Sequence, residues 1–174
     1  SYAVENALIG KYLQLINGVR CVGLLRKGDI RGEILFRSFG IDKFYYHKIG
    51  SFYQRCKYIY KSNIILKNIK NTKELCNFRL NKIDIGLTTY DTFMRYTGNP
   101  TCKEINFKLI LFFAEAMLAG DFFEKIFHNK NISGLVQSEL QFIPLSILFQ
   151  KFLLKKKKIY TRMGGHAPGI SIRV

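Results

Sequence analysis

The sequence has 174 residues, of which 48% are hydrophobic and 14% aromatic, a composition that can fill a core and that excludes a disordered chain. Lys and Arg outnumber Asp and Glu by 28 to 12, giving a net charge of +16, which favours anionic partners such as phosphates, nucleic acid or an acidic membrane surface. An A- and T-rich coding sequence also enriches Lys, Asn, Ile, Phe and Tyr together, so the charge has a genomic interpretation beside the functional one.

The four cysteines, Cys21, Cys56, Cys76 and Cys102, form no CxxC pair and have no close His in the sequence. This spacing predicts no zinc or other metal site and no disulfide framework, but reduced, mostly buried thiols in a cytoplasmic protein. No signal peptide is visible. The longest apolar run, residues 109–120, is too short to span a membrane. The sequence lacks an initiator Met and stops just after a predicted strand, and we therefore expect a piece of a longer protein.

Helices and strands are predicted to alternate along the chain. Apolar residues at a helical period, together with Gly and Pro stops, indicate the helices. The predicted helices are residues 4–17, 30–40, 51–80 with a break near Asn71 where Thr72 caps a new turn, 88–97, 104–128, and a last one that has Pro144 in its first turn and runs to the lysines at 155–158. Short runs that are apolar on both faces indicate the strands. The predicted strands are residues 19–25, 42–47, 83–87, 133–138 and 158–162.

This alternation is typical of an α/β fold. We predict one Rossmann-like domain over residues 1–174, with a parallel sheet of about five strands and helices on both faces. Ligands of such sheets bind at the carboxyl ends of the strands. The loops that follow the strands are therefore the candidate sites.

The stretch GLTTYDTFMRYTG, which begins at Gly86, follows the third predicted strand. Thr88 or Thr89 can cap the helix that comes next, and the free amides of its first turn can then bind an anion. Tyr90 follows them. Asp91 and Arg95 are four residues apart and share a helix face. They form either a surface ion pair or a site in which Asp91 binds sugar hydroxyls and Arg95 binds a phosphate.

The segment RMGGHAPG, residues 162–169, follows the fifth predicted strand. Gly164 and Gly165 allow the backbone to approach a ligand closely, and His166 can serve as an acid, a base or a phosphate donor. The alternative is a flexible loop with an idle His. Glu139 either holds a substrate hydroxyl or caps the next helix, and His47 is interpreted as structural. The lysines at 155–158 form a solvated helix end or contact anionic lipid.

Common catalytic signatures are missing from the sequence. There is no GxGxxG after the first predicted strand, no GxxxxGK[ST], no GxSxG and no HExxH, and no cofactor is predicted. Function must therefore be inferred from the strand-end residues.

One motif resembles a known family. The pattern on Gly86, Tyr90, Asp91, Thr92, Phe93, Met94 and Arg95 is similar to a motif of bacterial surface-carbohydrate biosynthesis proteins, the capsular polysaccharide and lipopolysaccharide glycosyltransferase-like enzymes. The predicted order of elements is also similar. The resemblance implies the N-terminal, acceptor-side half of a two-domain GT-B glycosyltransferase, with the nucleotide sugar bound mainly by a C-terminal half.

The resemblance implies transfer of a sugar from a nucleotide donor to a glycan or lipid-linked acceptor. Asp91 is the first candidate for activating the acceptor and His166 the second, while Thr88, Thr89, Tyr90, Arg95, Glu139, Gly164 and Gly165 are candidate substrate-binding residues. Such an enzyme is expected in the cytoplasm, with possible peripheral contact at the inner membrane. The alternative is a noncatalytic, basic nucleic-acid-binding module whose aromatic side chains stack on bases.

Overall fold

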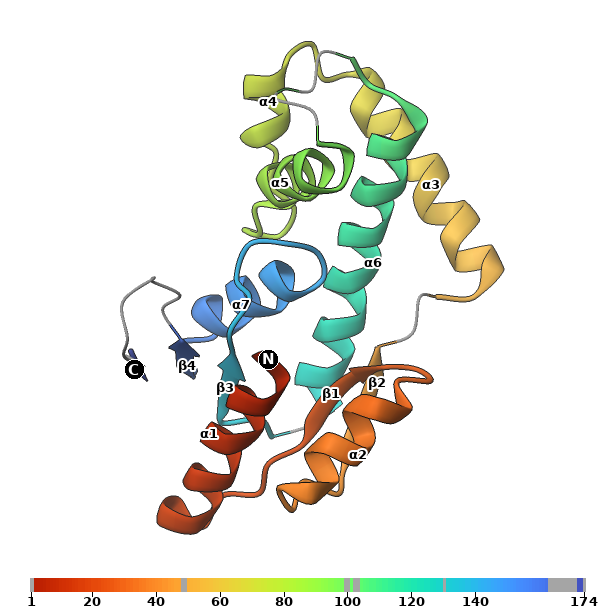
Figure 1. Cartoon of the computed structure of the whole chain (residues 1–174). Coiled ribbons are helices and arrows are strands. Elements are labelled where there is room, and N and C mark those ends of the chain that lie inside the picture. Colours follow the sequence, from red (N-terminus) through yellow and green to blue (C-terminus); the bar gives the residue numbers. More distant parts are fainter. Residues whose placement is uncertain are drawn as a thin grey trace. The chain divides into compact units, whose positions relative to one another are not determined.

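The structure is a computed structural model that describes residues 2–47, 50–98, 101, 104–129, 131–162 and 172–173. It is a mixed α/β protein (Figure 1). The described elements are α1 (Tyr2–Asn17), β1 (Gly23–Arg26), α2 (Ile30–Ser38), β2 (Phe44–His47), α3 (Phe52–Lys67), α4 (Thr72–Cys76), α5 (Ile85–Thr97), α6 (Phe107–Asn129), β3 (Gly134–Gln137), α7 (Leu145–Leu154), β4 (Lys158–Arg162) and β5 (Ile172–Arg173).

The chain divides into two compact units. Unit 1 contains residues 1–48, 136–138 and 160–174, and unit 2 contains residues 49–135 and 139–159. Helices α3 to α7 all belong to unit 2, so the helical core described below is a property of that unit alone.

The first strand pair is a β-α-β unit formed by β1, α2 and β2. The two strands are parallel, with Gly23 opposite Phe44 and Arg26 opposite His47. A methyl group on Gly23 would lie 2.7 Å from the Phe44 ring, so the ring occupies the space that a side chain would need. Asp29 caps α2 by accepting a hydrogen bond from the amide of Gly32 at 2.9 Å. The predicted alternation of strand, helix and parallel strand is confirmed here.

The second sheet has the strand order β3-β4-β5. Strands β3 and β4 are parallel and are joined through α7, which makes a second β-α-β unit. Strand β5 is antiparallel to β4, with Thr161 opposite Arg173. Strand β4 spans the predicted residues, and β3 lies inside its predicted range.

The predicted five-strand Rossmann-like sheet is wrong. The described strands form two small sheets, and residues 85–87 of the predicted third strand, 83–87, belong to helix α5. Ile83 pairs only with Leu80, through a tight turn in which Asn81 and Lys82 adopt positive φ. The alternation of Ile83 and Ile85 suggested a strand, but the residues buried after Ile85 follow the helical spacing of three and four. Besides Gly86, they are Thr88, Thr89, Thr92 and Phe93.

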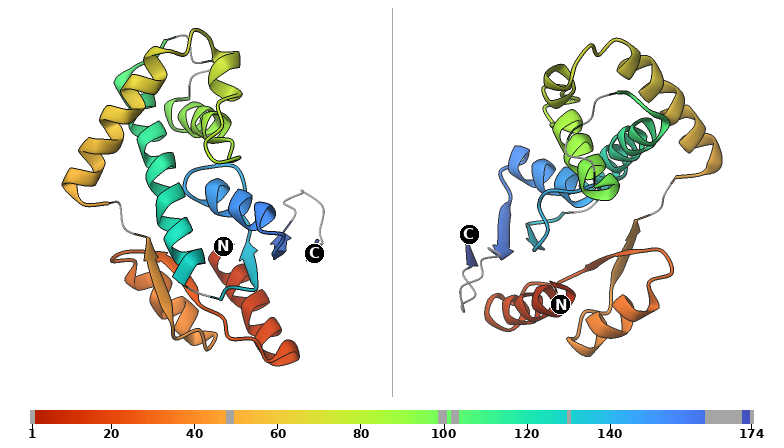
Figure 2. Two further views of the ribbon diagram at one scale, coloured as in Figure 1. Left: turned by 180° about the vertical axis from the view of Figure 1, so that it is seen from behind. Right: turned by 45° about the horizontal axis from the view of Figure 1, so that its top comes forward.

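The core of unit 2 is built around α6. Helices α3, α5 and α7 all contact it, and Figure 2 shows that α3 lies beside one end of α6 and diverges from it toward the other. Leu109, Phe113, Met117 and Phe123 line the buried side of α6. The spacing of these apolar residues is that of one helix face, which explains why the sequence predicted this helix correctly.

The other predicted helices are also present. Ser51 caps α3 in a capping box with Gln54, and the break near residue 71 exists, but Asn71 rather than Thr72 is the cap of α4. Cys21, Cys56 and Cys76 are not in disulfides, as predicted. Their predicted burial is wrong, because Cys56 is exposed and the other two are half-buried; Cys102 lies outside the described residues. In the part of the chain that is described, no helix is long and apolar enough to cross a membrane.

Candidate functional site

Thr88 and Thr89 do not cap α5, contrary to the prediction. The helix begins one turn earlier, at Ile85, and both threonines lie buried within it. The N-cap residue is Asp84, whose side chain makes no capping hydrogen bond. Its carboxylate instead accepts a hydrogen bond from Nε of Arg79 at 2.5 Å.

The first amides of α5 are already engaged. The amide of Ile85 donates to the carbonyl of Ile83 at 2.9 Å, and that of Gly86 donates to the carbonyl of Phe78 at 3.0 Å. An anion site at a helix terminus needs amides that are free to point at the ligand. The amides of Ile85 and Gly86 are not free, so the predicted anion site at this helix terminus is not supported.

The buried hydroxyl of Thr88 belongs to a polar network between α5 and α7. Its Oγ1 lies 3.1 Å from Oγ of Ser146 and accepts a hydrogen bond from Nε2 of Gln150 at 3.1 Å. Oε1 of the same Gln150 accepts the amide of Asp84 at 2.7 Å. The network satisfies polar groups that would otherwise be buried without partners. Thr88 therefore has a structural contact where the sequence suggested substrate binding.

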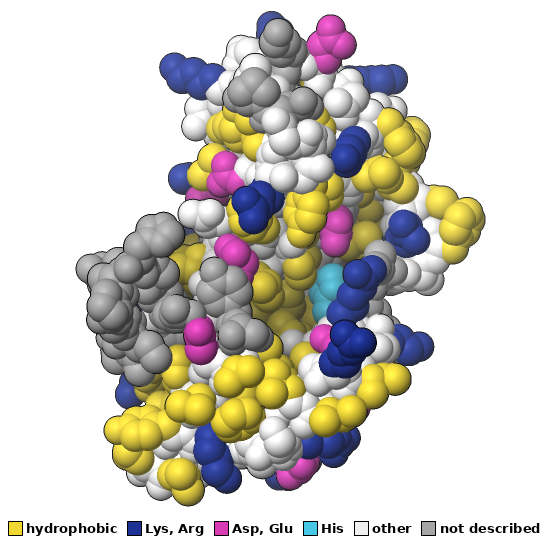
Figure 3. Space-filling model, viewed as in Figure 1, with side chains coloured by type: hydrophobic (Ala, Val, Ile, Leu, Met, Phe, Trp, Pro, Cys, Tyr) yellow, Lys and Arg dark blue, Asp and Glu magenta, His cyan; other side chains and the backbone are white. Residues whose placement is uncertain are grey.

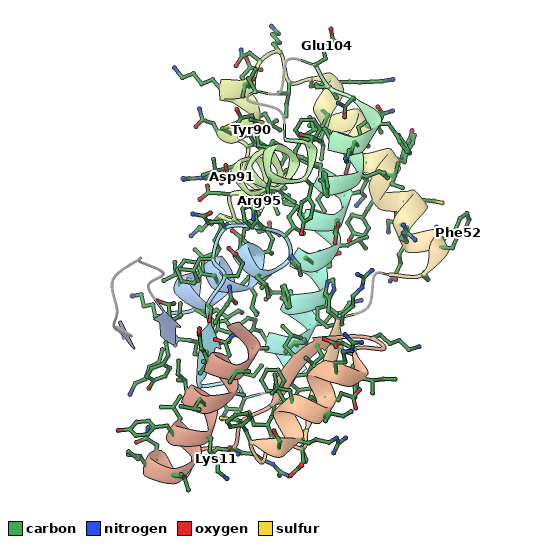
Figure 4. All side chains as sticks on the ribbon, viewed as in Figure 1. Lys11, Phe52, Tyr90, Asp91, Arg95 and Glu104 are labelled. Carbon is green, nitrogen blue, oxygen red and sulfur yellow. The ribbon has the colours of Figure 1, made fainter. Side chains whose placement is uncertain are left out.

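The outer face of α5 consists of Leu87, Tyr90, Asp91, Met94 and Arg95. These residues are half-buried or exposed, whereas the rest of the helix from Ile85 to Phe93 is buried. Successive helix residues turn by about 100°, which places the five on one side. Figure 4 labels Tyr90, Asp91 and Arg95 on α5. The tertiary fold thus directs the three predicted site residues outward.

Asp91 is the polar centre of this outer face. Its carboxyl group is partly desolvated, and this burial raises its pKa above the ordinary value for Asp. No hydrogen bond or ion pair joins Asp91 to another described residue, so the alternative of a surface ion pair with Arg95 is not observed. The guanidinium carbon of Arg95 lies 5.9 Å from the centroid of the Phe142 ring instead. A partly buried carboxyl group without a partner is costly and is found often at functional sites.

A surface depression of about 410 Å³ lies at the N-terminal end of this face. Its lining includes Leu87, which is one turn before Asp91, and the ion-paired side chains of Arg79 and Asp84. Cys76 and Asn77 complete the lining. The depression offers a cation, a carboxylate and an amide, which is a set of groups that can bind hydroxyl groups or a phosphate.

A second cavity of about 300 Å³ lies beside α6, in unit 2. Nζ of the buried Lys151 lies 2.5 Å from Oε2 of Glu124, and Nζ of Lys155 lies 3.2 Å from Oε1 of the same residue. These bonds lower the pKa of Glu124, that from Lys151 most strongly. Asp91 does not line this cavity. The lining residues are Leu80, Asn81, Ile83, Ile85, Met117, Gly120, Asp121, Glu124 and Lys151.

The remaining predicted residues have separate positions. Glu139 accepts the amide of Gln141 at 3.0 Å, and α7 begins only at Leu145, so Glu139 does not cap that helix. Burial, and then the charge of Arg26, lower the pKa of His47. Gly164, Gly165 and His166 lie outside the described residues. The expectation that their segment shares a cleft with Asp91 therefore stays a prediction.

Sequence reasoning missed Arg79, Asp84 and Asn77 as site residues. They precede or begin α5, and the prediction of a strand over 83–87 placed the chain differently there. A signal was present: Asn81 and Lys82 form the two-residue turn that reverses the chain between Leu80 and Ile83. Asn is favoured where such turns need positive φ.

No family model matches the chain, and no similar protein is found among curated proteins or solved structures.

Proposed function

We propose that the chain is part of a glycosyltransferase of bacterial surface polysaccharide assembly, which transfers a sugar from a nucleotide-sugar donor to a hydroxyl group of a glycan or lipid-linked acceptor. The chain supplies the acceptor side, at the cytoplasmic face of the membrane, and the donor is bound mainly by a second half of the enzyme. The observation that carries this proposal is Asp91 on the outer face of α5, which is partly desolvated and has no hydrogen bond or ion pair with another described residue.

The residues of the resembling motif divide into two groups in support of this reading. Gly86, Thr92 and Phe93 are buried and hold α5 in place. Tyr90, Asp91 and Arg95 are accessible on its outer side. A motif that served packing alone would not require the acid and the cation of the second group.

Asp91 acts as the general base in the proposed reaction. It takes the proton of the acceptor hydroxyl as that oxygen attacks the anomeric carbon of the donor sugar, while the bond from that carbon to the diphosphate breaks. A carboxyl group with a raised pKa is a better base at neutral pH than an ordinary Asp. Asn77, Arg79 and Asp84 in the adjoining depression bind acceptor hydroxyl groups, and Arg95 binds an anionic substituent.

Saturation-transfer NMR tests the proposed ligand class. The probes are a nucleotide sugar, an acidic oligosaccharide and a short single-stranded DNA, each presented to the wild-type chain, to Asp91→Asn and to Asp42→Asn. Asp42 is an exposed carboxylate at 4.0 Å from Arg37, and its variant is the matched control.

We expect the oligosaccharide to receive saturation from the wild-type chain and from Asp42→Asn, and to bind Asp91→Asn about tenfold more weakly, the effect of losing a charge-assisted hydrogen bond. Equal binding by all three proteins would contradict a role for Asp91. Saturation of the DNA alone would instead identify a nucleic-acid-binding module.

A further inference from the structure

Helix α3 exposes an aromatic and aliphatic stripe to solvent. The exposed fractions are 84% for Phe52, 76% for Tyr53, 67% for Tyr60 and 46% for Ile64. At about 100° per residue these four positions fall on one side of the helix. Figure 4 labels Phe52 at the outer end of α3. We call this stripe the outer face of α3.

A different side of α3 holds the helix on the protein. Ser62 and Leu66 are buried there, and Oγ of Ser62 lies 3.7 Å from the sulfur of Met117 on α6. The hydroxyl of Tyr58 donates to the carboxylate of Asp121, also on α6. Because these contacts already attach α3 to the fold, the outer face is not needed for folding.

The charge on α3 is entirely positive. The helix carries Arg55, Lys57, Lys61 and Lys67 and no Asp or Glu. Nζ of Lys61 lies 5.6 Å from the centroid of the Tyr58 ring. Figure 3 shows hydrophobic and basic side chains together along the edge of the molecule where α3 lies. Exposed aromatics with flanking Lys and Arg are the combination found in helices that lie in a membrane interface.

We propose that the outer face of α3 binds an anionic lipid surface. Phe52, Tyr53, Tyr60 and Ile64 enter the boundary between headgroups and acyl chains, and the flanking cations contact lipid phosphates. Tyr is enriched at this depth because its ring is apolar and its hydroxyl is polar. The inference does not rest on the proposed transferase activity, although a lipid-linked acceptor would lie at the same surface.

A nucleic acid is the weaker match for this face. Proteins that bind single strands combine aromatic side chains with a basic groove that follows the backbone. Here the aromatics lie on the exposed side of one helix, together with the aliphatic Ile64, and neither cavity described above includes a residue of α3. Charge complementarity and apolar content together favour the lipid surface.

Vesicle co-sedimentation tests the proposal. The chain is mixed with vesicles of phosphatidylcholine alone or of phosphatidylcholine with phosphatidylglycerol. The aromatic variant is Phe52→Ser with Tyr60→Ser, and the charge variant is Lys57→Gln with Lys61→Gln. The control is Phe107→Ser with Leu153→Ser, which removes two exposed apolar side chains of unit 2 that belong to α6 and α7 and not to α3. Circular dichroism confirms that each variant is folded.

We expect the wild-type chain and the control to bind the anionic vesicles and to release them as salt is raised. The charge variant and the aromatic variant should each bind about tenfold or more weakly. Equal binding by the aromatic variant and the control, or no preference for anionic vesicles, would overturn the proposal. So would a result in which the α3 substitutions abolish only self-association, measured by sedimentation velocity, or only the binding of single-stranded DNA.

Discussion

Gly86 lies against the main chain of Leu75: a methyl group on Gly86 would be 1.7 Å from the carbonyl oxygen of Leu75. The amide of Gly86 also donates to the carbonyl of Phe78 at 3.0 Å. Helix α5 can therefore pack against the end of α4 only where no side chain intervenes. The glycine of the GLTTYDTFMR motif has a packing role here, and the accessible residues of the motif are those further along the helix.

Gly86→Ala is expected to destabilise the protein by about 3 kcal/mol or more, because the obstructing atom is backbone and cannot move aside as a side chain would. Urea unfolding followed by circular dichroism measures the change. The control is Gly120→Ala inside α6, where a methyl group meets no heavy atom within 4 Å; there we expect a gain of about 0.5–1 kcal/mol from helix propensity. If Gly86→Ala and Gly120→Ala changed the free energy of unfolding by the same amount and in the same direction, this account of Gly86 would be wrong.

Asp91→Asn should lower transferase turnover about a hundredfold or more if Asp91 is the base, while leaving the fold intact. Burial raises the folded-state pKa of Asp91, so its contribution to stability is complete below the unfolded pKa and is lost as pH rises through the folded pKa. At neutral pH the variant should therefore be as stable as the wild type or slightly more stable. Thermal melts at neutral and acidic pH measure the stability, and a transfer assay with the proposed two-domain enzyme measures the turnover. Unchanged turnover would remove Asp91 from the reaction.

Ser146→Ala tests the buried network between α5 and α7. Oγ of Ser146 lies 3.1 Å from Oγ1 of Thr88 and accepts from Nε2 of Gln150 at 3.2 Å. Removing this hydroxyl group takes one hydrogen-bond partner from the side chains of Thr88 and Gln150. We expect about 1–3 kcal/mol of destabilisation in urea unfolding. Ser38→Ala, which removes one exposed local bond to the carbonyl of Leu35, should stay within about 0.5 kcal/mol. If the two variants were equally stable, Thr88 would be available for another role.

Glu124→Gln removes the carboxylate that neutralises Lys151, whose side chain is only 8% exposed. We expect a loss of about 1–3 kcal/mol, because a buried cation is left with a weaker partner. The folded-state pKa of Glu124 is lowered, so the stabilisation is present above the unfolded pKa and is lost as pH falls through the folded pKa. Urea titrations at several acidic pH values should show this dependence in the wild type and not in the variant. Lys155→Gln, at a more exposed position, should have a small effect.

The sequence by itself determined most helices and four of the five predicted strands. Residues such as Leu109, Phe113 and Phe123 recur at the spacing of one helix face, and this local period is visible without any partner. Likewise Gly98, which ends α5 at a positive φ of 67°, is a stop signal that acts within a few residues. The placement of Tyr90, Asp91 and Arg95 on one helix was also predicted from the sequence.

Only the tertiary structure decided which strands pair and which side of each helix is accessible. Ile83 and Ile85 are buried, and their burial fits a strand as well as the start of a helix. The structure forms the helix, which packs against α4 and α7. Because the predicted third strand is absent, the described strands do not form one five-strand sheet. Thr88 became a core residue because Ser146 and Gln150, which are far along the chain, complete its hydrogen bonds. The exposure of Phe52 and Tyr60 was equally hidden, because an aromatic side chain has the same local pattern whether a neighbouring helix covers it or leaves it in solvent.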